Sequence, residues 1–328
     1  MKRRRFFQYS GLGGLGFLLT VRNSAFASTF AQLEGQSPLA LETFEFTVNT
    51  VDQAGNIRQQ QTRKARFFPE SFRGGRNPAH EQANEQLEMV EITPGKFWMG
   101  PSRSEAQTSD AQTKALPRHQ VNLSSFFISK YPITQSQWAA VAALPKIKRE
   151  LNPAPSNFQG GSRPVESVSW LDAMEFCDRI SQHTGRRYQL PSEAQWEYAC
   201  RAGTETPFNT GETITSQLAD YMASATYKAE TVGDYRQSTV PVGSFSPNAF
   251  GLHDMHGNVW EWCADSWHRN YRGAPTNGQP RVTVSAQRSR TIRGGGWLDT
   301  PNKIRSASRS GYTETALNRT IGFRVMTV

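Results

Sequence analysis

The sequence predicts a loop-rich α+β fold, and three observations support this class. The chain of 328 residues contains 26 glycines and 18 prolines, which favour many turns and short regular elements. Eight tryptophans and 19 phenylalanines supply large apolar side chains, so a core can form without long periodic elements. Two motifs combine glycine with tryptophan, GNVWEW at 257–262 and RGGGW at 293–297, and we expect loops to pack into the core there.

The first 27 residues are predicted to be an export signal. A basic start precedes a glycine-containing apolar stretch at 11–21, and Ala25-Phe26-Ala27 forms a small-x-small cleavage site. The arginines at 3–5, directly before two phenylalanines, are typical of a twin-arginine signal, with an ordinary secretory signal as the alternative. The apolar stretch is too short to span a membrane. We therefore expect an exported bacterial protein, periplasmic or extracellular, with no stable membrane span.

A net charge of +9 is compatible with a nucleic-acid partner, but the distribution of the charge argues against one. Five basic residues lie within 1–27, where there is no acidic residue, so the mature chain is only weakly basic. The remainder contains no stripe of lysine and arginine interleaved with aromatic residues. We expect a protein, a peptide or a small molecule as the ligand, and no nucleic acid.

The segment 28–86 is predicted to be an N-terminal extension. Phe44, Phe46 and Val48 alternate with polar residues, which is the pattern of a half-buried strand, and a turn at 52–56 leads into a return strand. Together these elements predict a hairpin over 41–68. The residues from 69 to 86 are rich in Gly, Asn, Pro, Glu and Gln and are interpreted as a linker. The main domain is therefore expected to span 87–328.

Three helix starts are marked by capping boxes, in which a hydroxyl and an acid or amide three residues later satisfy the free backbone amides of the first turn. The pairs are Thr134 with Gln137, Ser169 with Asp172, and Ser192 with Gln195. The second helix is expected to end at Gly185 as its C-cap and the third by Gly203. Because each helix is short, strand and loop must make up most of the main domain.

The chain contains three cysteines, Cys177, Cys200 and Cys263. A dense disulfide framework is therefore excluded even in an oxidising compartment, and one bridge with one free thiol is the most that the chain can form. The spacing leaves open which two cysteines would pair.

Several segments in the main domain form an ordered set. They are MVEITPGKFWMG at 89–100, PITQSQW at 132–138, RPVESVSW at 163–170, YQLPSEAQWEYACR at 188–201, PNAFGL at 247–252, GNVWEW at 257–262 and GFRV at 322–325. In this order and spacing the chain resembles the formylglycine-generating enzyme family, also called sulfatase-modifying factors. The resemblance implies a C-type-lectin-like α+β fold over 87–328, mostly irregular, with short helices and small antiparallel sheets. Fold does not assign chemistry, so the site residues are considered individually.

The resemblance locates the chemistry of the family and argues against copper in this chain. In oxidase members, two cysteines after a Gly-Gly-Ser-Trp turn bind copper(I), and the matching positions are Leu298 and Lys303. Neither side chain can be a soft metal ligand or a thiol nucleophile, so standard oxidase activity is not expected and the catalytic residues stay unassigned. Gly296 replaces the serine of the turn. The candidate cleft lies near Trp297 and Arg309.

The same resemblance bears on disulfides and iron. The three cysteines match structural cysteines of the family, but the family's partner positions near the C-terminus are Ser306 and Val325, so those bridges are not expected. Iron is left open, because other branches hold it with a separate histidine-rich helical module, and the six histidines here are scattered. His253 and His256 lie in a loop, where a structural role is the more common one.

Structural calcium is expected by resemblance at two places. The first set is Asp220, the Tyr221 carbonyl, Asp234 and the Arg236 carbonyl, and the second is Asp254 with the carbonyls of Gly257 and Val259. Carboxylate and carbonyl oxygens are the hard donors that Ca²⁺ prefers. The alternative is that these acids are solvated in turns.

Two functions are considered. The enzyme hypothesis links the chain, by resemblance, to oxidative modification of protein cysteine or thiol substrates. The binding hypothesis assigns a non-catalytic, lectin-like ligand- or protein-binding module to the polar segment 298–320, which lacks helix or strand periodicity. That segment also resembles the variable C-terminus of retroelement-diversified proteins with this fold, with an ordinary surface loop as the alternative. Its candidate ligand-binding residues are Asp299, Asn302, Ser308, Tyr312 and Asn318.

Overall fold

A computed structural model describes residues 39–73, 84–102, 105, 114–283 and 288–328. The chain divides into residues 1–40 and a compact unit from Leu41 to Val328, and the elements below all belong to the second unit. The export signal expected at 1–27 lies outside the described residues. Within the described part of the chain, no helix is both long and apolar enough to cross a membrane.

A five-stranded antiparallel sheet begins with the predicted hairpin. Its strands, in the order β1-β2-β3-β6-β11, are β1 (Glu42–Val51), β2 (Ile57–Arg73), β3 (Asn84–Ile92), β6 (Phe126–Ser129) and β11 (Met326–Thr327). The hairpin over 41–68 is confirmed, because β1 and β2 pair from Glu42 with Phe67 to Val51 with Ile57. In the turn between them, Asp52 Oδ1 accepts hydrogen bonds from the amides of Ala54 and Asn56.

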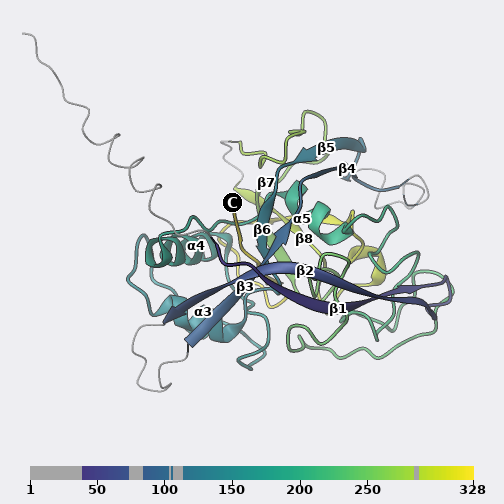
Figure 1. Ribbon diagram of the computed structural model, residues 1–328, viewed down its shortest axis with the longest axis horizontal. Helices are drawn as coiled ribbons and strands as arrows, with labels where there is room; N and C mark the ends of the chain where they lie inside the picture. The colour runs from purple at the N-terminus through teal and green to yellow at the C-terminus, as the bar shows by residue number, and fades with distance from the viewer. Residues whose placement is uncertain (1–38, 74–83, 103–104, 106–113, 284–287) are drawn as a thin grey trace, which may run out of the picture. The chain divides into compact units, whose positions relative to one another are not determined.

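The linker expected at 69–86 is wrong for the described residues 69–73 and 84–86. There β2 continues and pairs with β3, from Phe67 opposite Val90 to Arg73 opposite Asn84. Phe68 and Phe72 lie on the buried face of this longer strand. The polar composition predicts a linker, but pairing with β3 and the burial of Phe68 and Phe72 make the described part of this segment a strand. In Figure 1, β1, β2 and β3 lie side by side, so the hairpin shares one sheet with the main domain.

Two smaller sheets carry the remaining strands. The four-stranded sheet has the order β10-β7-β8-β9, with β10 (Ile321–Gly322), β7 (Trp260–Ser266), β8 (Ser289–Arg293) and β9 (Arg309–Thr313). The two-stranded sheet pairs β4 (Gly95–Met99) with β5 (His119–Leu123). A 3₁₀ turn, η2 (Pro301–Lys303), lies between β8 and β9 in the chain.

The capping boxes correctly locate three helices, α3 (Gln135–Ala142), α4 (Trp170–Thr184) and α5 (Glu193–Arg201). In each helix the hydroxyl at the N-cap accepts from the backbone three residues later, and the side chain at that later position accepts from the N-cap amide. Gly185 ends α4 with a φ of 72°, a left-handed conformation that favours glycine. Helix α5 ends at Ala202, one residue before Gly203.

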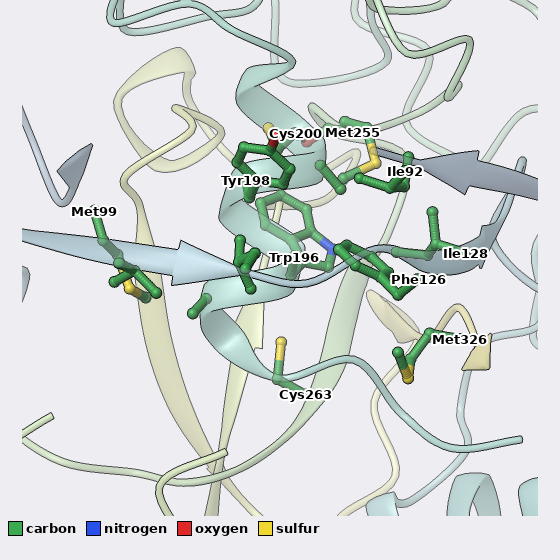
Figure 2. Close-up of a cluster of buried hydrophobic side chains, with 14 of the residues drawn as sticks. Ile92, Met99, Phe126, Ile128, Trp196, Tyr198, Cys200, Met255, Cys263 and Met326 are labelled. Carbon is green, nitrogen blue, oxygen red and sulfur yellow. Dashed lines mark hydrogen bonds between the residues drawn. The ribbon is translucent and has the colours of Figure 1, made fainter. Parts of the chain in front are cut away.

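Trp196 of α5 lies in the middle of the main hydrophobic core (Figure 2). Side chains from β3, β4, β6 and β11 surround it, including Ile92, Met99, Phe126, Ile128 and Met326. Cys200 and Cys263 are buried in the same cluster, and none of the three cysteines is bridged. Burial raises the pKa of the Cys200 thiol to about 12, so this sulfur is held in the unreactive neutral form.

Two buried ion pairs fix the two glycine–tryptophan motifs in place. Glu261 accepts from Arg324 Nε at 2.6 Å and from Trp196 Nε1 at 2.6 Å. Arg293 donates to Glu197 and to the carbonyls of Ser306 and Ser308. These charges are fully buried, and each is compensated by an opposite charge, which the fold requires to tolerate them. The motifs at 257–262 and 293–297 therefore hold the loops after β8 in one arrangement.

Candidate functional site

The segment 298–320 forms one side of a cleft of about 260 Å³. The four-stranded sheet, whose strand β9 is part of this segment, also contributes Trp260 from β7, Ile292 from β8 and Ile321 from β10. Strand β9 contributes Ser310 and Tyr312, whose side chains share a face because residues two apart on a strand point the same way. An apolar floor beside polar walls is the usual composition of a ligand pocket.

All five ligand-binding candidates line this one cleft. They are Asp299, Asn302, Ser308, Tyr312 and Asn318. Leu298, Lys303 and Arg309 line it too, whereas Trp297 does not. Trp297 is buried behind it, with the Phe158 ring 5.3 Å away and the Arg319 guanidinium 5.2 Å from its own ring. Trp297 is thus a packing residue next to the cleft.

Two parts of the cleft were missed by the sequence analysis. Lys114 and Ala115 line it although they precede the segment by more than 180 residues, and Trp260 contributes from the GNVWEW motif. No local pattern marks such residues, since only the tertiary fold brings them to the cleft. The tryptophan motif could have suggested Trp260, because successive residues of a strand face opposite sides, so one part of the motif can face the core while another faces the cleft.

Asp299 presents a carboxylate held in a fixed position. Its Oδ2 accepts from Trp260 Nε1 at 2.7 Å and from the Gly296 amide at 3.0 Å. Burial raises the pKa of this carboxyl, and the hydrogen bonds from Gly296 and Trp260, followed by the Lys303 charge, oppose that rise. No described residue donates a hydrogen bond to its second oxygen, Oδ1. Because Asp299 lines the cleft, this oxygen is a fixed acceptor for a ligand.

Tyr312 presents a fixed hydroxyl. The Oδ1 of Asn318 accepts from the amide of Thr320 at 2.9 Å and from its hydroxyl at 2.8 Å, so the amide nitrogen of Asn318 must point the other way. That nitrogen donates to the Tyr312 hydroxyl oxygen at 3.1 Å. The Tyr312 oxygen already accepts, so its own hydrogen is directed elsewhere and can be donated to a ligand.

Arg309 differs from the other candidates because its charge is already paired. Its guanidinium binds both carboxylate oxygens of Glu193, at 2.5 and 2.7 Å, and donates to the carbonyls of Lys114 and His268. The guanidinium carbon lies 4.4 Å from the ring centres of both Trp267 and Tyr271. Arg309 therefore fixes the wall of the cleft from behind.

The positions of the family cysteines, Leu298 and Lys303, both belong to the wall of the cleft. Leu298 is 41% exposed and offers a hydrocarbon surface, and Lys303 ends η2. No described cysteine lines the cleft. The donor set present here does not fit copper(I), because no thiolate is available at either position.

His253 and His256 are used by the fold. The Nδ1 of His256 lies 2.6 Å from the Ile304 carbonyl, and its Nε2 accepts from the Asn209 amide at 3.0 Å. Both ring nitrogens are thus engaged, and burial lowers the pKa of His256 to about 4. His253 binds the Phe245 carbonyl at 2.8 Å, and burial likewise lowers its pKa to about 4. These contacts make both histidines structural.

The two aspartates that head the calcium sets lie close together. Asp220 Oδ1 and Oδ2 and Asp254 Oδ1 are buried and accept no hydrogen bond from the described residues. Burial raises the pKa of Asp220 to about 7 and that of Asp254 to about 6, and the Asp254 charge adds to the effect on Asp220. Gly257 lies beside Asp220 and has a φ of 83°. A Cβ at this position would lie 2.1 Å from the Asp220 carbonyl oxygen, so only glycine fits.

Unsatisfied buried carboxylate oxygens of this kind fit a hard cation such as calcium. The other expected ligands do not all point toward these two aspartates or have free oxygens. The Arg236 guanidinium lies 3.8 Å from Asp220 Oδ1, and the Tyr221 carbonyl already accepts from the Ala223 amide. Asp234 is exposed and uses its amide to bind Ser216, while Val259 is buried. The structure thus brings Asp220, Asp254 and Gly257 together and leaves the carboxylate of Asp234 at the surface.

Comparisons with known proteins agree with this architecture. The family description "Sulfatase-modifying factor enzyme 1-like domain" matches residues 75–327. The chaperone protein LppX of Paenibacillus barcinonensis is 30% identical over 63% of this chain and 81% of its own length. The formylglycine-generating enzyme of Thermomonospora curvata is 28% identical over 72% of this chain and 92% of its own.

The solved structure of PvdO from Pseudomonas aeruginosa has a TM-score of 0.63 and 33% identity, covering 74% of this chain and 94% of that one. The kinase pkn1 of Chlamydia caviae also matches at 29% identity, but this chain spans 37% of its length. The matched region includes both charge-paired motifs and the cleft. The chain therefore belongs to the sulfatase-modifying factor family, which includes the formylglycine-generating enzymes, and has its loop-rich C-type-lectin-like α+β fold.

Proposed function

We propose that the cleft of residues 298–320 binds a peptide, a protein segment or a small molecule, and that the chain does so without thiolate–copper chemistry. One observation carries the proposal. Five polar residues selected from the sequence line the same cleft as the two positions where oxidase members have cysteine. The site of the family's chemistry is retained as a concave surface, while its thiols are replaced.

The cleft offers three kinds of contact. Trp260, Ile292 and Ile321 form an apolar floor that can bury a hydrocarbon or aromatic group. Asp299 supplies a fixed acceptor and Tyr312 a fixed donor. Prepositioned polar groups beside an apolar floor favour binding, because little side-chain freedom is lost when a ligand arrives.

Cleft binding can be tested with selected peptides and a blocking variant. Peptides chosen from a random displayed library should bind the wild-type chain and lose at least about tenfold in affinity with Leu298→Trp, which fills the cleft. Leu317→Trp is the matched control, because Leu317 is also exposed but does not line the cleft. Equal binding by the Leu298→Trp variant, measured by titration calorimetry, would reject the cleft as the binding site.

Oxidative modification of a protein cysteine or thiol substrate is the second candidate, favoured by membership of the family. The test is to incubate the copper-loaded chain with a cysteine-containing sulfatase-motif peptide and to look for aldehyde by mass spectrometry. We expect none, because Leu298 and Lys303 cannot hold copper as a thiolate pair would. The Thermomonospora curvata relative serves as the positive control. Aldehyde formation would replace the binding proposal with an enzymatic one.

Diversification by a retroelement is a narrower version of the binding proposal. It requires a near-copy of the coding stretch for 298–320 in the same genome, differing at adenines. Genome sequencing around the gene decides this point, and the lack of such a copy would leave binding by an unvaried cleft.

We also propose that calcium has a structural role beside Asp220 and Asp254. The proposal is supported by their unsatisfied buried oxygens, which a cation would compensate. Titration calorimetry on the metal-stripped chain should show heat on calcium addition, and the melting temperature should rise. Asp254→Asn should reduce both effects, whereas no heat and no rise in the wild-type chain would exclude calcium.

Export to the periplasm or the cell exterior is proposed from the sequence of 1–27. Fractionation of a producing bacterium should recover the processed chain outside the cytoplasm. Replacing Arg3 and Arg4 by lysine should trap the precursor inside if the twin-arginine route is used. Export unaffected by that change would indicate the ordinary secretory route instead.

A further inference from the structure

A second pocket, of about 290 Å³, lies at the β4–β5 sheet and shares no lining residue with the cleft. In Figure 1, β4 and β5 lie near α5, and the end of α5 supplies part of the lining. The pocket is lined by Gly95, Lys96, Phe97, Trp98, Gln120, Tyr198, Arg201, Gly203, Thr204, Glu205 and Phe250. Neither the family chemistry nor the proposed cleft function uses these side chains.

Three aromatic rings build the inner part of this pocket. The ring centre of Tyr198 lies 5.4 Å from that of Phe97 and 5.5 Å from that of Phe250. The Tyr198 hydroxyl donates to the Thr93 carbonyl at 3.2 Å. Gly95 makes this possible, because a Cβ there would lie 2.3 Å from the Tyr198 oxygen. The rings are tilted by 54° to one another in both contacts, so they form an angled apolar surface.

Trp98 is unusual among the tryptophans because it is 46% exposed. Its ring is held from one side by the Arg118 guanidinium, whose carbon lies 5.6 Å from the ring centre. Arg118 in turn pairs with Glu205 at 2.7 Å. An indole that the fold does not need for its core is therefore fixed at the rim of a pocket, where it can serve as a platform.

Polar side chains lie around the exposed Trp98 ring at the rim of the pocket. Gln120 lies directly opposite Trp98 in the β4–β5 register, and no described residue binds its side-chain amide. Glu205 uses one carboxylate oxygen for Arg118 and keeps the other. The Thr204 hydroxyl donates to the Arg201 carbonyl, so its oxygen can still accept. The pocket therefore offers both donors and acceptors at its rim.

We propose that this pocket binds a pyranose unit of a neutral oligosaccharide. A pyranose has a face of C–H groups, which suits the electron-rich face of an indole, and a rim of hydroxyls that both donate and accept hydrogen bonds. The guanidinium charges of Arg118 and Arg201 are compensated by Glu205 and Glu197, so neither arginine attracts an anion into the pocket. Exposed Lys96 disfavours a cationic ligand.

Binding of defined trisaccharides tests this proposal on the full chain. Maltotriose, cellotriose, mannotriose and chitotriose are titrated by calorimetry and by tryptophan fluorescence. At least one of them should bind with a dissociation constant on the order of 1 mM or tighter. Trp98→Ala should weaken that binding at least about tenfold, while Trp98→Phe should retain most of it because a ring remains.

Two controls keep the outcomes decisive. Tyr312→Ala removes an aromatic side chain from the separate cleft and should leave sugar binding unchanged. Gln120→Ala removes a hydrogen-bonding group without disturbing a buried side chain, so it reports on the pocket even if Trp98→Ala misfolds. No binding by any of the four sugars, unchanged binding in both pocket variants, or loss of binding in Tyr312→Ala alone would overturn the proposal.

Discussion

The buried charge network and the cleft lie close together but differ in the burial and pairing of their polar groups. In the network, Glu261, Arg324, Glu197 and Arg293 are fully buried and every one is paired. In the cleft, Leu298 and Tyr312 are exposed and the polar groups are arranged around open space. The network consists of the residues that carry the resemblance to the family, whereas the cleft contains the positions that depart from it.

This difference separates the determinants of the fold from those of the chemistry. A buried charge that loses its partner is strongly unfavourable, so the network can change only as a unit. Leu298 lies on the wall of the cleft and is 41% exposed, and replacing an exposed side chain that is not part of such a network has little effect on the fold. The chain can therefore keep the family architecture while Leu298 and Lys303 replace a metal-binding pair.

Breaking the network should produce the largest effect. Glu261→Gln keeps the shape of the side chain but leaves the Arg324 guanidinium without its counter-charge, at a position with no solvent exposure. The free energy of unfolding should fall by about 3–5 kcal/mol, measured by chemical denaturation. The control is Glu45→Gln, which removes an exposed pair with Lys64 and should leave the denaturation midpoint nearly unchanged, because water screens this pair. Equal effects of the two variants would contradict the comparison.

A disulfide that the family pattern contains can be restored next to the network. Cys200 Sγ lies 3.7 Å from Ser306 Oγ, and Ser306 is the position of a family bridge partner. Ser306→Cys should therefore form a bridge with Cys200 under oxidising conditions and stabilise the chain by up to about 4 kcal/mol, since it closes a long loop. The melting temperature is compared with and without reductant. The variant has four cysteines, so a bridge leaves two free thiols; four free thiols after oxidation, counted by mass spectrometry, would show that the pair cannot bridge.

The network also extends to a carboxyl whose charge depends on pH. Asp265 accepts from the Glu193 and Arg281 amides, yet burial, with the Glu193 charge, raises its pKa to about 7. The carboxyl keeps its proton in the folded chain over a range where the unfolded chain has lost it. Its contribution to stability is therefore complete below about pH 4 and is lost as the pH rises to about 7.

Asp265→Asn removes that titration. The stability of the wild-type chain relative to this variant should decrease between pH 4 and pH 7, by an amount on the order of a few kcal/mol. Denaturation curves at several pH values measure the difference in the free energy of unfolding between the two chains. Groups that titrate alike in both chains cancel from this difference. A difference that stays constant or grows with pH would show that Asp265 is ionised in the folded chain.

Local chemistry explains why much of the fold was predictable. The three capping boxes and the alternation in β1 involve contacts within a few residues, and the structure contains the corresponding elements. The extension of β2 was not predictable in this way, because the burial of Phe68 and Phe72 depends on pairing with β3. Its polar composition resembles that of a linker until the partner strand is known.

The candidate cleft shows the same limit. Asp299, Asn302 and Ser308 could be predicted because they belong to the polar segment that directly follows the RGGGW motif. Lys114 and Ile292 line the same cleft, but the contacts that bring them there are long-range and leave no local pattern. The pocket at Trp98 was missed for a different reason, because an exposed tryptophan and a buried one look alike in a sequence.

Replacing residues on the wall of the cleft should have the smallest effect on stability. It also tests whether the absence of cysteine at positions 298 and 303 is enough to explain why this chain is not expected to bind copper. The double variant Leu298→Cys, Lys303→Cys restores two thiols across η2, on one wall of the cleft. Its free energy of unfolding should stay within about 1 kcal/mol of the wild-type value. It should also bind one equivalent of copper(I) in competition with a chelator, because a thiolate pair suits this soft ion.

Each single variant is the matched control and should bind more weakly. If the double variant folds but does not bind copper, the remaining geometry of the cleft has also diverged, and the two replaced positions alone do not account for the difference from the oxidases.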